Sequence, residues 1–385
     1  MALLGIRPQT LYAYVTRRRI GAKADPDDPR RSLYRAADVK ALAQRRKRGR
    51  AVEAVAAGTI AWGDPILPTA IATVAQERLF YRGRDAAELA ANATLEEVAA
   101  LLWNAKAFGP SNIGAPRRAA AHAGKTKPDR CADPRAHVFA VLAARAGADE
   151  PAFGRAPVAL QAEAADLMML VAGAFASRTA HDMPIHRRLA DQWGCGAAGA
   201  DAVRRALVLL ADHELNASTF AARVTASTGA SLAASVLAGL CALSGPLHGG
   251  AALQVHALVA EAQRSGAEPA VRTWLAQGRP IPGFGHPLYP GGDPRALALL
   301  RVLRPPPHMR TLAQTVEAIV GEQPNIDFAL AVLVHALRLP HDAAFILFLV
   351  ARCAGWLAHA LEQLASGYLI RPRARYIGTP VAAGP

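Results

Sequence analysis

Helical hydrophobic patterning runs almost without interruption from Met183-Pro184 to Leu243. Apolar residues make up 52% of the chain and are mainly alanine and leucine, whereas aromatic residues make up 6%. This mixture favours close-packed helices, because a sheet would need more valine, isoleucine, threonine and aromatic side chains. A length of 385 residues allows two domains, or one large domain with an appendage. We therefore predict an all-α fold.

The cysteines and the most apolar segment constrain the environment of the protein. The four cysteines are far apart and form no C-x-x-C pair, which is typical of free thiols in a reducing compartment. Histidine and cysteine do not occur at metal-ligand spacing, so we predict no metal site. The most apolar run, Ala343 to Ala351, is too short to span a bilayer and ends at Arg352. No signal-peptide pattern follows Met1, and we expect a soluble, cytoplasmic protein that binds no membrane.

Positive charge is concentrated near the N-terminus. Residues 1–50 contain 14 Lys and Arg against four Asp, a net charge of +10, whereas the whole chain carries +14. A uniformly basic body is thereby excluded. Such an asymmetric distribution indicates contact with a nucleic acid or another polyanion.

The same segment has the pattern of a small folded unit. Pro8 suits the first turn of a helix, and apolar residues then recur at helical spacing as far as Val15. A turn-rich stretch, 24–31, and a second short helix, 36–44, follow. This order resembles the winged helix-turn-helix of the MerR and excisionase type, although the helix that would precede Gly5 has only four residues.

The resemblance implies that residues 1–50 bind duplex DNA, with the helix beginning at Pro8 as the recognition helix. The side chains expected to meet base edges or phosphates are Arg7, Gln9, Thr10, Arg17, Arg18 and Arg19. A basic arm that contacts a second subunit or improves solubility is the alternative interpretation.

Four short segments place ionisable residues inside apolar sequence. They are D-H-E-L-N-A-S-T-F from Asp212, G-P-L-H-G-G from Gly245, G-F-G-H from Gly283 with D-P-R ending at Arg295, and P-N-I-D-F from Pro324. The second and third each hold a histidine on a Gly/Pro turn, where a glycine lets another chain or a ligand approach closely. A single such histidine is usually structural, but two of them beside an acid at a helix start indicate a site.

Asp327 and Arg352 each allow two interpretations. Asp327 lies just after Asn325, a good N-cap, so it could simply support the helix N-terminus. Its apolar neighbours would also desolvate it and strengthen it as a base. Arg352 interrupts an apolar run and must therefore be paired. Its partner is either an internal carboxylate or the carboxylate of a substrate, which arginine binds in bidentate fashion.

Together these segments resemble the citrate synthase family. Further matches are the Arg-Gly pair at Arg82, A-R-x-x-G-W from Ala351 and R-P-R from Arg371. The resemblance covers about residues 58–378. It implies a large helical domain formed by residues 51–248 and 340–385 and a small helical domain formed by 249–339, both preceded by the basic segment 1–50.

The resemblance also implies a role for each matched residue. Asp327 corresponds to the base that removes a proton from the methyl carbon of an acyl-CoA. His248 corresponds to the donor to the thioester oxygen, and His286 to the residue that polarises the carbonyl of oxaloacetate. The carboxylates of oxaloacetate would be bound by His213, Arg295, Arg352 and Arg371, the last of which reaches across from the partner subunit of a homodimer.

The implied activity is the condensation of acetyl-CoA with oxaloacetate and hydrolysis of the thioester to citrate and CoA, without a metal or cofactor. Pro287, Ala252 and the sequence 289–292 depart from the family pattern beside the matched residues. These changes bear on substrate preference and CoA affinity. A 2-methylcitrate synthase, which uses propionyl-CoA, and a DNA-binding regulator with a metabolite-sensing, enzyme-like body remain the alternatives.

Overall fold

The computed structural model describes residues 22–24, 32–34, 39, 67–106, 134–176, 183–374 and 376–379. Residue contacts divide the chain into two compact units, Met1–Pro68 and Thr69–Pro385. Each unit is described by itself.

The first unit contains a short antiparallel hairpin. Strand β1 (Ala22–Ala24) pairs with β2 (Ser32–Tyr34), and Ala22 lies opposite Tyr34. The strands flank the predicted turn-rich stretch. The helices predicted at 8–15 and 36–44, and with them Arg7, Gln9, Thr10, Arg17, Arg18 and Arg19, lie outside the described residues, except for a helical position at Val39.

The second unit begins with a small sheet that leads into helices. Strands β3 (Ala72–Ala75), β4 (Arg78–Tyr81) and β5 (Arg84–Asp85) pair antiparallel in this order. Two short helices follow, α3 (Ala86–Asn92) and α4 (Leu95–Leu102). Asp85 caps α3 by accepting hydrogen bonds from two backbone N–H groups, and Thr94 forms a capping box at the start of α4.

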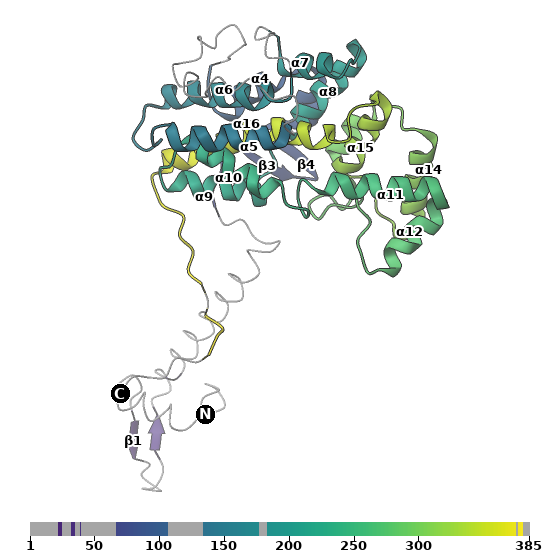
Figure 1. Ribbon diagram of the computed structural model, residues 1–385. Coiled ribbons are helices and arrows are strands. Elements are labelled where there is room, and N and C mark those ends of the chain that lie inside the picture. Colours follow the sequence, from purple (N-terminus) through teal and green to yellow (C-terminus); the bar gives the residue numbers. More distant parts are fainter. Residues whose placement is uncertain are drawn as a thin grey trace. The chain divides into compact units, whose positions relative to one another are not determined.

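The larger helical body contains most of the remaining chain (Figure 1). Its elements are α5 (Pro134–Ala148), α6 (Pro157–Gly173), α7 (Ile185–Gln192), α8 (Ala197–Leu210), α9 (Ala217–Ser227) and α10 (Leu232–Leu243). The continuous helical patterning predicted for 184–243 is therefore divided into four helices. The break after α8 is the most important for function, because it forms the loop that contains Asp212 and His213.

A long helix, α16 (Ala343–Ser366), runs through the centre of this body and packs against α4, α6, α8, α9 and α10. The apolar run that Arg352 interrupts is only the first part of this helix, which has 24 residues in all. By length and composition alone it could cross a membrane, but 89% of its apolar window is buried in the protein, as in the core helix of a soluble domain. Gly239 of α10 permits this packing, because a Cβ there would lie 2.6 Å from the Trp356 ring.

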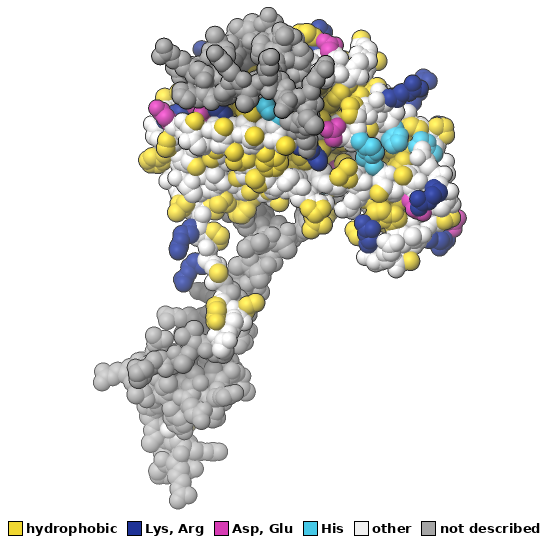
Figure 2. Space-filling view, in the orientation of Figure 1, with side chains coloured by type: hydrophobic (Ala, Val, Ile, Leu, Met, Phe, Trp, Pro, Cys, Tyr) yellow, Lys and Arg dark blue, Asp and Glu magenta, His cyan; other side chains and the backbone are white. Residues whose placement is uncertain are grey.

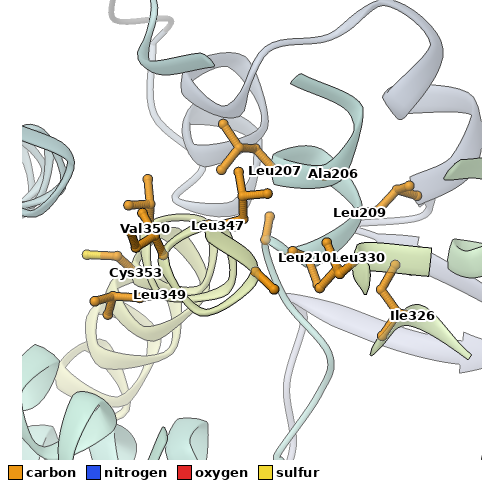
Figure 3. Close-up of a cluster of buried hydrophobic side chains, with 14 of the residues drawn as sticks. Ala206, Leu207, Leu209, Leu210, Ile326, Leu330, Leu347, Leu349, Val350 and Cys353 are labelled. Atoms are coloured by element: carbon orange, nitrogen blue, oxygen red, sulfur yellow. The ribbon is translucent and has the colours of Figure 1, made fainter. Parts of the chain in front are cut away.

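A second group of helices lies at the right of Figure 1. Its elements are α11 (Ala251–Ser265), α12 (Ala267–Ala276), α13 (Pro294–Leu300), α14 (Pro307–Val320) and α15 (Ile326–Leu337). Figure 3 shows buried side chains that join α15 to the larger body, with Leu330 of α15 beside Leu210 of α8. The described chain is mostly helical, as predicted, and the β3–β5 sheet is the addition that composition did not indicate.

Histidine side chains also gather on the face of this group that is drawn in Figure 2. The ring of His256 on α11 lies 4.7 Å from that of His341 and 5.7 Å from that of His335, between ring centroids. His308 on α14 lies 5.8 Å from His335. We call these four residues the histidine cluster.

Candidate active site

The loop between α8 and α9 brings His213 into the interior. Its Nε2 lies 2.9 Å from the hydroxyl of Tyr289, and the ring is 5.1 Å from that of His286, edge to face. The hydroxyl of Tyr81 donates to the carbonyl of Val208 at 3.0 Å, in the last turn of α8 before this loop begins. Asn216 ends the loop by capping α9.

A backbone bridge joins the turn that carries His286 to the helix start that carries Asp327. Gly285 N donates to the carbonyl of Gln323 at 2.9 Å, and the Asn325 side chain donates to the carbonyl of Gly285 at 3.0 Å. Gly283 has φ +85°, and a Cβ there would lie 2.9 Å from Val255, so only glycine fits this turn. The local Gly and Asn residues therefore join the turn that carries His286 to the start of α15, which carries Asp327.

A buried ion pair strengthens the same junction. Arg295 donates two hydrogen bonds to Asp293, at 2.9 and 2.8 Å, and both side chains are almost wholly buried. Asp293 also accepts from the backbone N–H of Ile326 at 3.0 Å, at the start of α15. Although burial disfavours the charged form, the pKa of Arg295 is raised by Asp293. The pair thus fixes the position from which Asp327 projects.

Arg352 differs from Arg295, because its charge is not paired in the described part of the chain. Its Nε donates to the carbonyl of Leu210 at 2.9 Å, and its guanidinium lies 4.7 Å from the ring centroid of Phe348. No carboxylate among the described residues lies within ion-pair distance of Arg352. Burial lowers its pKa to about 10, partly offset by Asp212, so the group stays charged at neutral pH.

His248 faces α9 and α16. Its Nε2 lies 2.8 Å from Ser218 Oγ, which also accepts from Trp356 Nε1 at 3.1 Å and donates to Asn216 Oδ1 at 2.8 Å. Burial, with a smaller effect of Arg352, lowers the pKa of His248 to about 4. The imidazole is therefore neutral near pH 7.

The surroundings shift the pKa of Asp327 and the pKa values of His213 and His286 in opposite directions. Burial raises the pKa of Asp327 to about 6, although Arg295 and Arg352 favour its charged form. Burial and Arg295 lower the pKa of His286 to about 4, and they lower the pKa of His213 well below its usual value. At neutral pH the site therefore offers a carboxylate of raised basicity beside uncharged imidazoles, an arrangement suited to acid–base chemistry.

Six of the seven residues predicted for catalysis or oxaloacetate lie in this region: His213, His248, His286, Arg295, Asp327 and Arg352. Arg371 does not. It is exposed, and its neighbour Ile370 donates to Ser227 Oγ at the C-terminal end of α9, whereas Ser218 lies at the N-terminal end. Within one chain Arg371 is therefore separated from the site by most of helix α9.

Three residues of the site were missing from the prediction. Ser218 and Asp293 lie inside two of the motifs, but nothing local indicates that they contact His248 and the start of α15. Tyr289 follows the G-F-G-H turn and contacts His213, which is 76 positions away in sequence. Within the described residues, no group of three or more His, Cys, Asp or Glu side chains is arranged to hold a metal ion.

The mostly helical chain thus gathers a carboxylate of raised pKa, neutral imidazoles and buried guanidinium groups in one region. The family model described as "Citrate synthase, C-terminal domain" matches residues 60–373, and the chain therefore belongs to the citrate synthase family.

Individual relatives agree with this assignment. Citrate synthase 2 of Bacillus subtilis is 41% identical over 46% of this chain and 51% of its own length. The 2-methylcitrate synthase 1 of Corynebacterium glutamicum is 35% identical over 48% of this chain and 52% of its own length. The chain thus spans about half the length of these two relatives. The crystal structure of citrate synthase from Thermotoga maritima matches with a TM-score of 0.67 at 29% identity, covering 84% of this chain and 96% of that one.

Proposed function

We propose that the protein condenses acetyl-CoA with oxaloacetate and hydrolyses the resulting thioester, giving citrate and CoA. The observation that carries this proposal is that one region holds Asp327 with its raised pKa, neutral imidazoles and Arg352, which forms no ion pair among the described residues. No metal or redox cofactor enters the reaction, and CoA takes part only as the thioester substrate.

Asp327 acts as the base for the methyl group of acetyl-CoA. A pKa of about 6 leaves its carboxylate ionised at neutral pH and makes it more basic than an exposed aspartate. As the proton leaves, negative charge develops on the thioester oxygen, and a donor held there lowers the barrier. His248 supplies this donor from Nδ1–H, which requires the single proton of the Ser218 hydroxyl to turn from Asn216 Oδ1 to His248 Nε2.

His286 polarises the carbonyl that the new carbanion attacks. Its Nδ1 accepts from the backbone N–H of Leu288 at 3.2 Å, so in the neutral ring the proton is on Nε2. Nε2–H is thereby the donor for the carbonyl oxygen of oxaloacetate. His213, Arg295 and Arg352 bind the two carboxylates.

Charge balance supports a homodimer. Asp293 pairs with Arg295, and the buried carboxylates of Asp212 and Asp327 favour the charged form of Arg352, whereas oxaloacetate brings two negative charges into a buried space. A further cation is required, and we assign it to Arg371 of the partner subunit. The large domain (51–248 and 340–385) and the small domain (249–339) would then enclose the substrates.

Free-thiol release from acetyl-CoA in the presence of oxaloacetate tests the proposal. We expect turnover that depends on both substrates. Propionyl-CoA is assayed alongside, because one methylene changes discrimination by only about 1–3 kcal/mol and the relatives include a 2-methylcitrate synthase. Faster turnover of propionyl-CoA would favour that alternative. Binding of oxaloacetate by folded protein without thiol release from either thioester would favour the metabolite-sensing regulator.

We further propose that residues 1–50 bind duplex DNA. The hairpin β1–β2 supports this, because it stands where the wing of a winged helix-turn-helix would follow the recognition helix. The net charge of +10 supplies phosphate contacts through Arg17, Arg18 and Arg19. Arg7, Gln9 and Thr10 would meet base edges at the beginning of the recognition helix.

Retention on duplex DNA tests this second proposal. Binding should weaken with salt with a log–log slope of roughly −0.9 per phosphate neutralised. A protein truncated to residues 51–385 should lose DNA retention and keep its condensation activity. Absence of binding by the full chain at about 50 mM salt, where such contacts are strongest, would identify the segment as a basic arm.

A further inference from the structure

Tyr289 contacts three of the residues proposed to bind oxaloacetate, yet none of the roles described above uses it. Its side chain is buried, with the hydroxyl 2.9 Å from His213 Nε2. Its ring lies 4.9 Å from the ring of His286, and the guanidinium of Arg295 lies 5.4 Å from its centroid. The phenol therefore stands at the centre of the proposed oxaloacetate pocket.

The direction of the Tyr289–His213 hydrogen bond follows from which of the two groups has an acceptor for its proton. In the described part of the chain the phenol hydroxyl has no hydrogen-bond partner besides His213 Nε2. If the imidazole donated, the phenol proton would be a buried donor without an acceptor, which is unfavourable. Burial raises the pKa of Tyr289 and lowers that of His213, so the phenol keeps its proton and the ring is neutral. The hydroxyl therefore donates, and Nε2 accepts.

This direction fixes the tautomer of His213. A neutral imidazole that accepts at Nε2 carries its proton on Nδ1. Among the described residues Nδ1 has no hydrogen-bond partner, and it is not one of the buried side-chain atoms that lack one, so it retains access to solvent. The charged and ionisable groups that act on this ring are Arg295, Arg352, His286 and His248. An N–H donor thus faces a space lined by groups suited to an anion.

We propose that Tyr289 is a positioning residue, which holds His213 as the Nδ1–H tautomer and so presents a donor to a carboxylate of oxaloacetate. The identity of the ligand rests on the proposed function, whereas the tautomer does not. With the proton on Nε2, the lone pair of Nδ1 would face the carboxylate and repel it. Of the two neutral tautomers of His213, Tyr289 thereby selects the one that carries its proton on Nδ1.

Long-range ¹H–¹⁵N NMR of the ¹⁵N-histidine-labelled, ligand-free full chain tests the tautomer directly. The His213 signals are assigned by their loss in His213→Gln. We expect a protonated Nδ1 in the wild type and loss of this preference in Tyr289→Phe. A protonated Nε2 in the wild type would overturn the proposal, and so would an unchanged tautomer in a folded Tyr289→Phe protein. The wild-type spectrum alone decides the matter if the variant does not fold.

Calorimetric titration with oxaloacetate tests the consequence for binding. Tyr289→Phe should raise the dissociation constant about tenfold or more, the size of one hydrogen bond to a charged group, with kcat at saturation within a few-fold of the wild type. The control is Ser235→Ala, which removes another buried hydroxyl, one that bonds to the backbone carbonyl of Ser231 and does not touch the His213 loop. Equal effects of the two substitutions, or no effect of Tyr289→Phe, would contradict a positioning role. Failure of the wild type to bind oxaloacetate would instead refute the proposed function and leave the tautomer to the NMR result.

Discussion

Ser218 Oγ lies 2.8 Å from His248 Nε2 and is the contact through which helix α9 orients the imidazole. The same hydroxyl accepts from Trp356 Nε1 at 3.1 Å, so one buried atom connects α9, the His248 turn and the central helix α16. Ser218 is fully buried, and water cannot replace its hydroxyl without rearrangement. The orientation of His248 therefore depends on a residue that touches no substrate in the proposed mechanism.

Replacing Ser218 by alanine should impair both stability and turnover. The substitution leaves the indole N–H and the imidazole without their partner, which costs about 1–3 kcal/mol for a buried group. We expect kcat to fall on the order of tenfold or more, since His248 loses the contact that sets its ring direction. Thiol-release kinetics and urea unfolding measure the two effects.

Thr219 provides the control for this substitution. It is the next residue, equally buried, and its Oγ1 has no hydrogen-bond partner among the described residues. Thr219→Val should therefore change kcat little. If both substitutions reduce kcat to the same extent, the Ser218 contact has no specific role in orienting His248.

Asp327→Asn should abolish most turnover while preserving the fold. The backbone N–H of residue 327 still donates to Asn325, at 3.0 Å in the wild type, so the start of α15 is kept. We expect kcat to fall by several orders of magnitude, at least about 10²-fold, with oxaloacetate affinity nearly unchanged. A variant that retains more than about a tenth of the wild-type kcat would exclude Asp327 as the base. In the wild type, kcat should decline as the pH falls through about 6, where the carboxylate is protonated.

The histidine cluster should make the folded protein sensitive to mild acid. Burial and the neighbouring imidazoles of His341 and His335 lower the pKa of His256 to about 4, so the unfolded chain binds this proton first as the pH falls. Above the ordinary histidine pKa of about 6.5 the ring is neutral in both the folded and the unfolded chain, and the free energy of unfolding has its full value. As the pH falls from there toward about 4, the proton binds to the unfolded chain but not to the folded one, so the free energy of unfolding decreases. At 1.36 kcal/mol per pKa unit, the loss from His256 approaches about 3 kcal/mol.

Urea unfolding of the wild type and His256→Leu between pH 8 and pH 4.5 measures this effect. The variant should lose less unfolding free energy over this range, because it removes the group that titrates. Measurements at pH 8 serve as the internal control, since the ring is neutral there and any difference reflects packing alone. Parallel curves over the whole range would rule out a contribution of His256 to acid sensitivity.

The site residues that are most easily predicted from the sequence are those whose position depends on neighbours only a few residues away in the chain. His286 and Asp327 are placed by glycine turns and an asparagine cap that are visible within a few positions. The helical fold follows from the Ala/Leu composition and periodicity in the same way. The partner of Arg352 is different, because the carbonyl of Leu210 is 142 positions away and becomes available only where α8 ends.

The same limit applies to the Tyr289–His213 and Ser218–His248 contacts, which cross between helices. No periodicity or motif spacing specifies which hydroxyl meets which imidazole, because that depends on how the helices pack. The small β3–β5 sheet was not predicted for a related reason. Its strands have two to four residues, too short for an alternating pattern to stand out against the surrounding sequence.

Arg371 should complete the active site of a second subunit. Within one chain it is exposed and lies beyond the far end of α9, so it can complete a site only in another subunit. Arg371→Ala and Asp327→Asn should each be nearly inactive alone. Mixed heterodimers of the two variants should regain activity, because one of their two sites would contain both an intact Asp327 and an intact Arg371. The measurement is thiol release before and after subunit exchange, with exchange verified by native mass spectrometry and with each variant mixed with itself as the control. Heterodimers that form but remain as inactive as the parents would show that Arg371 does not act across the subunit boundary.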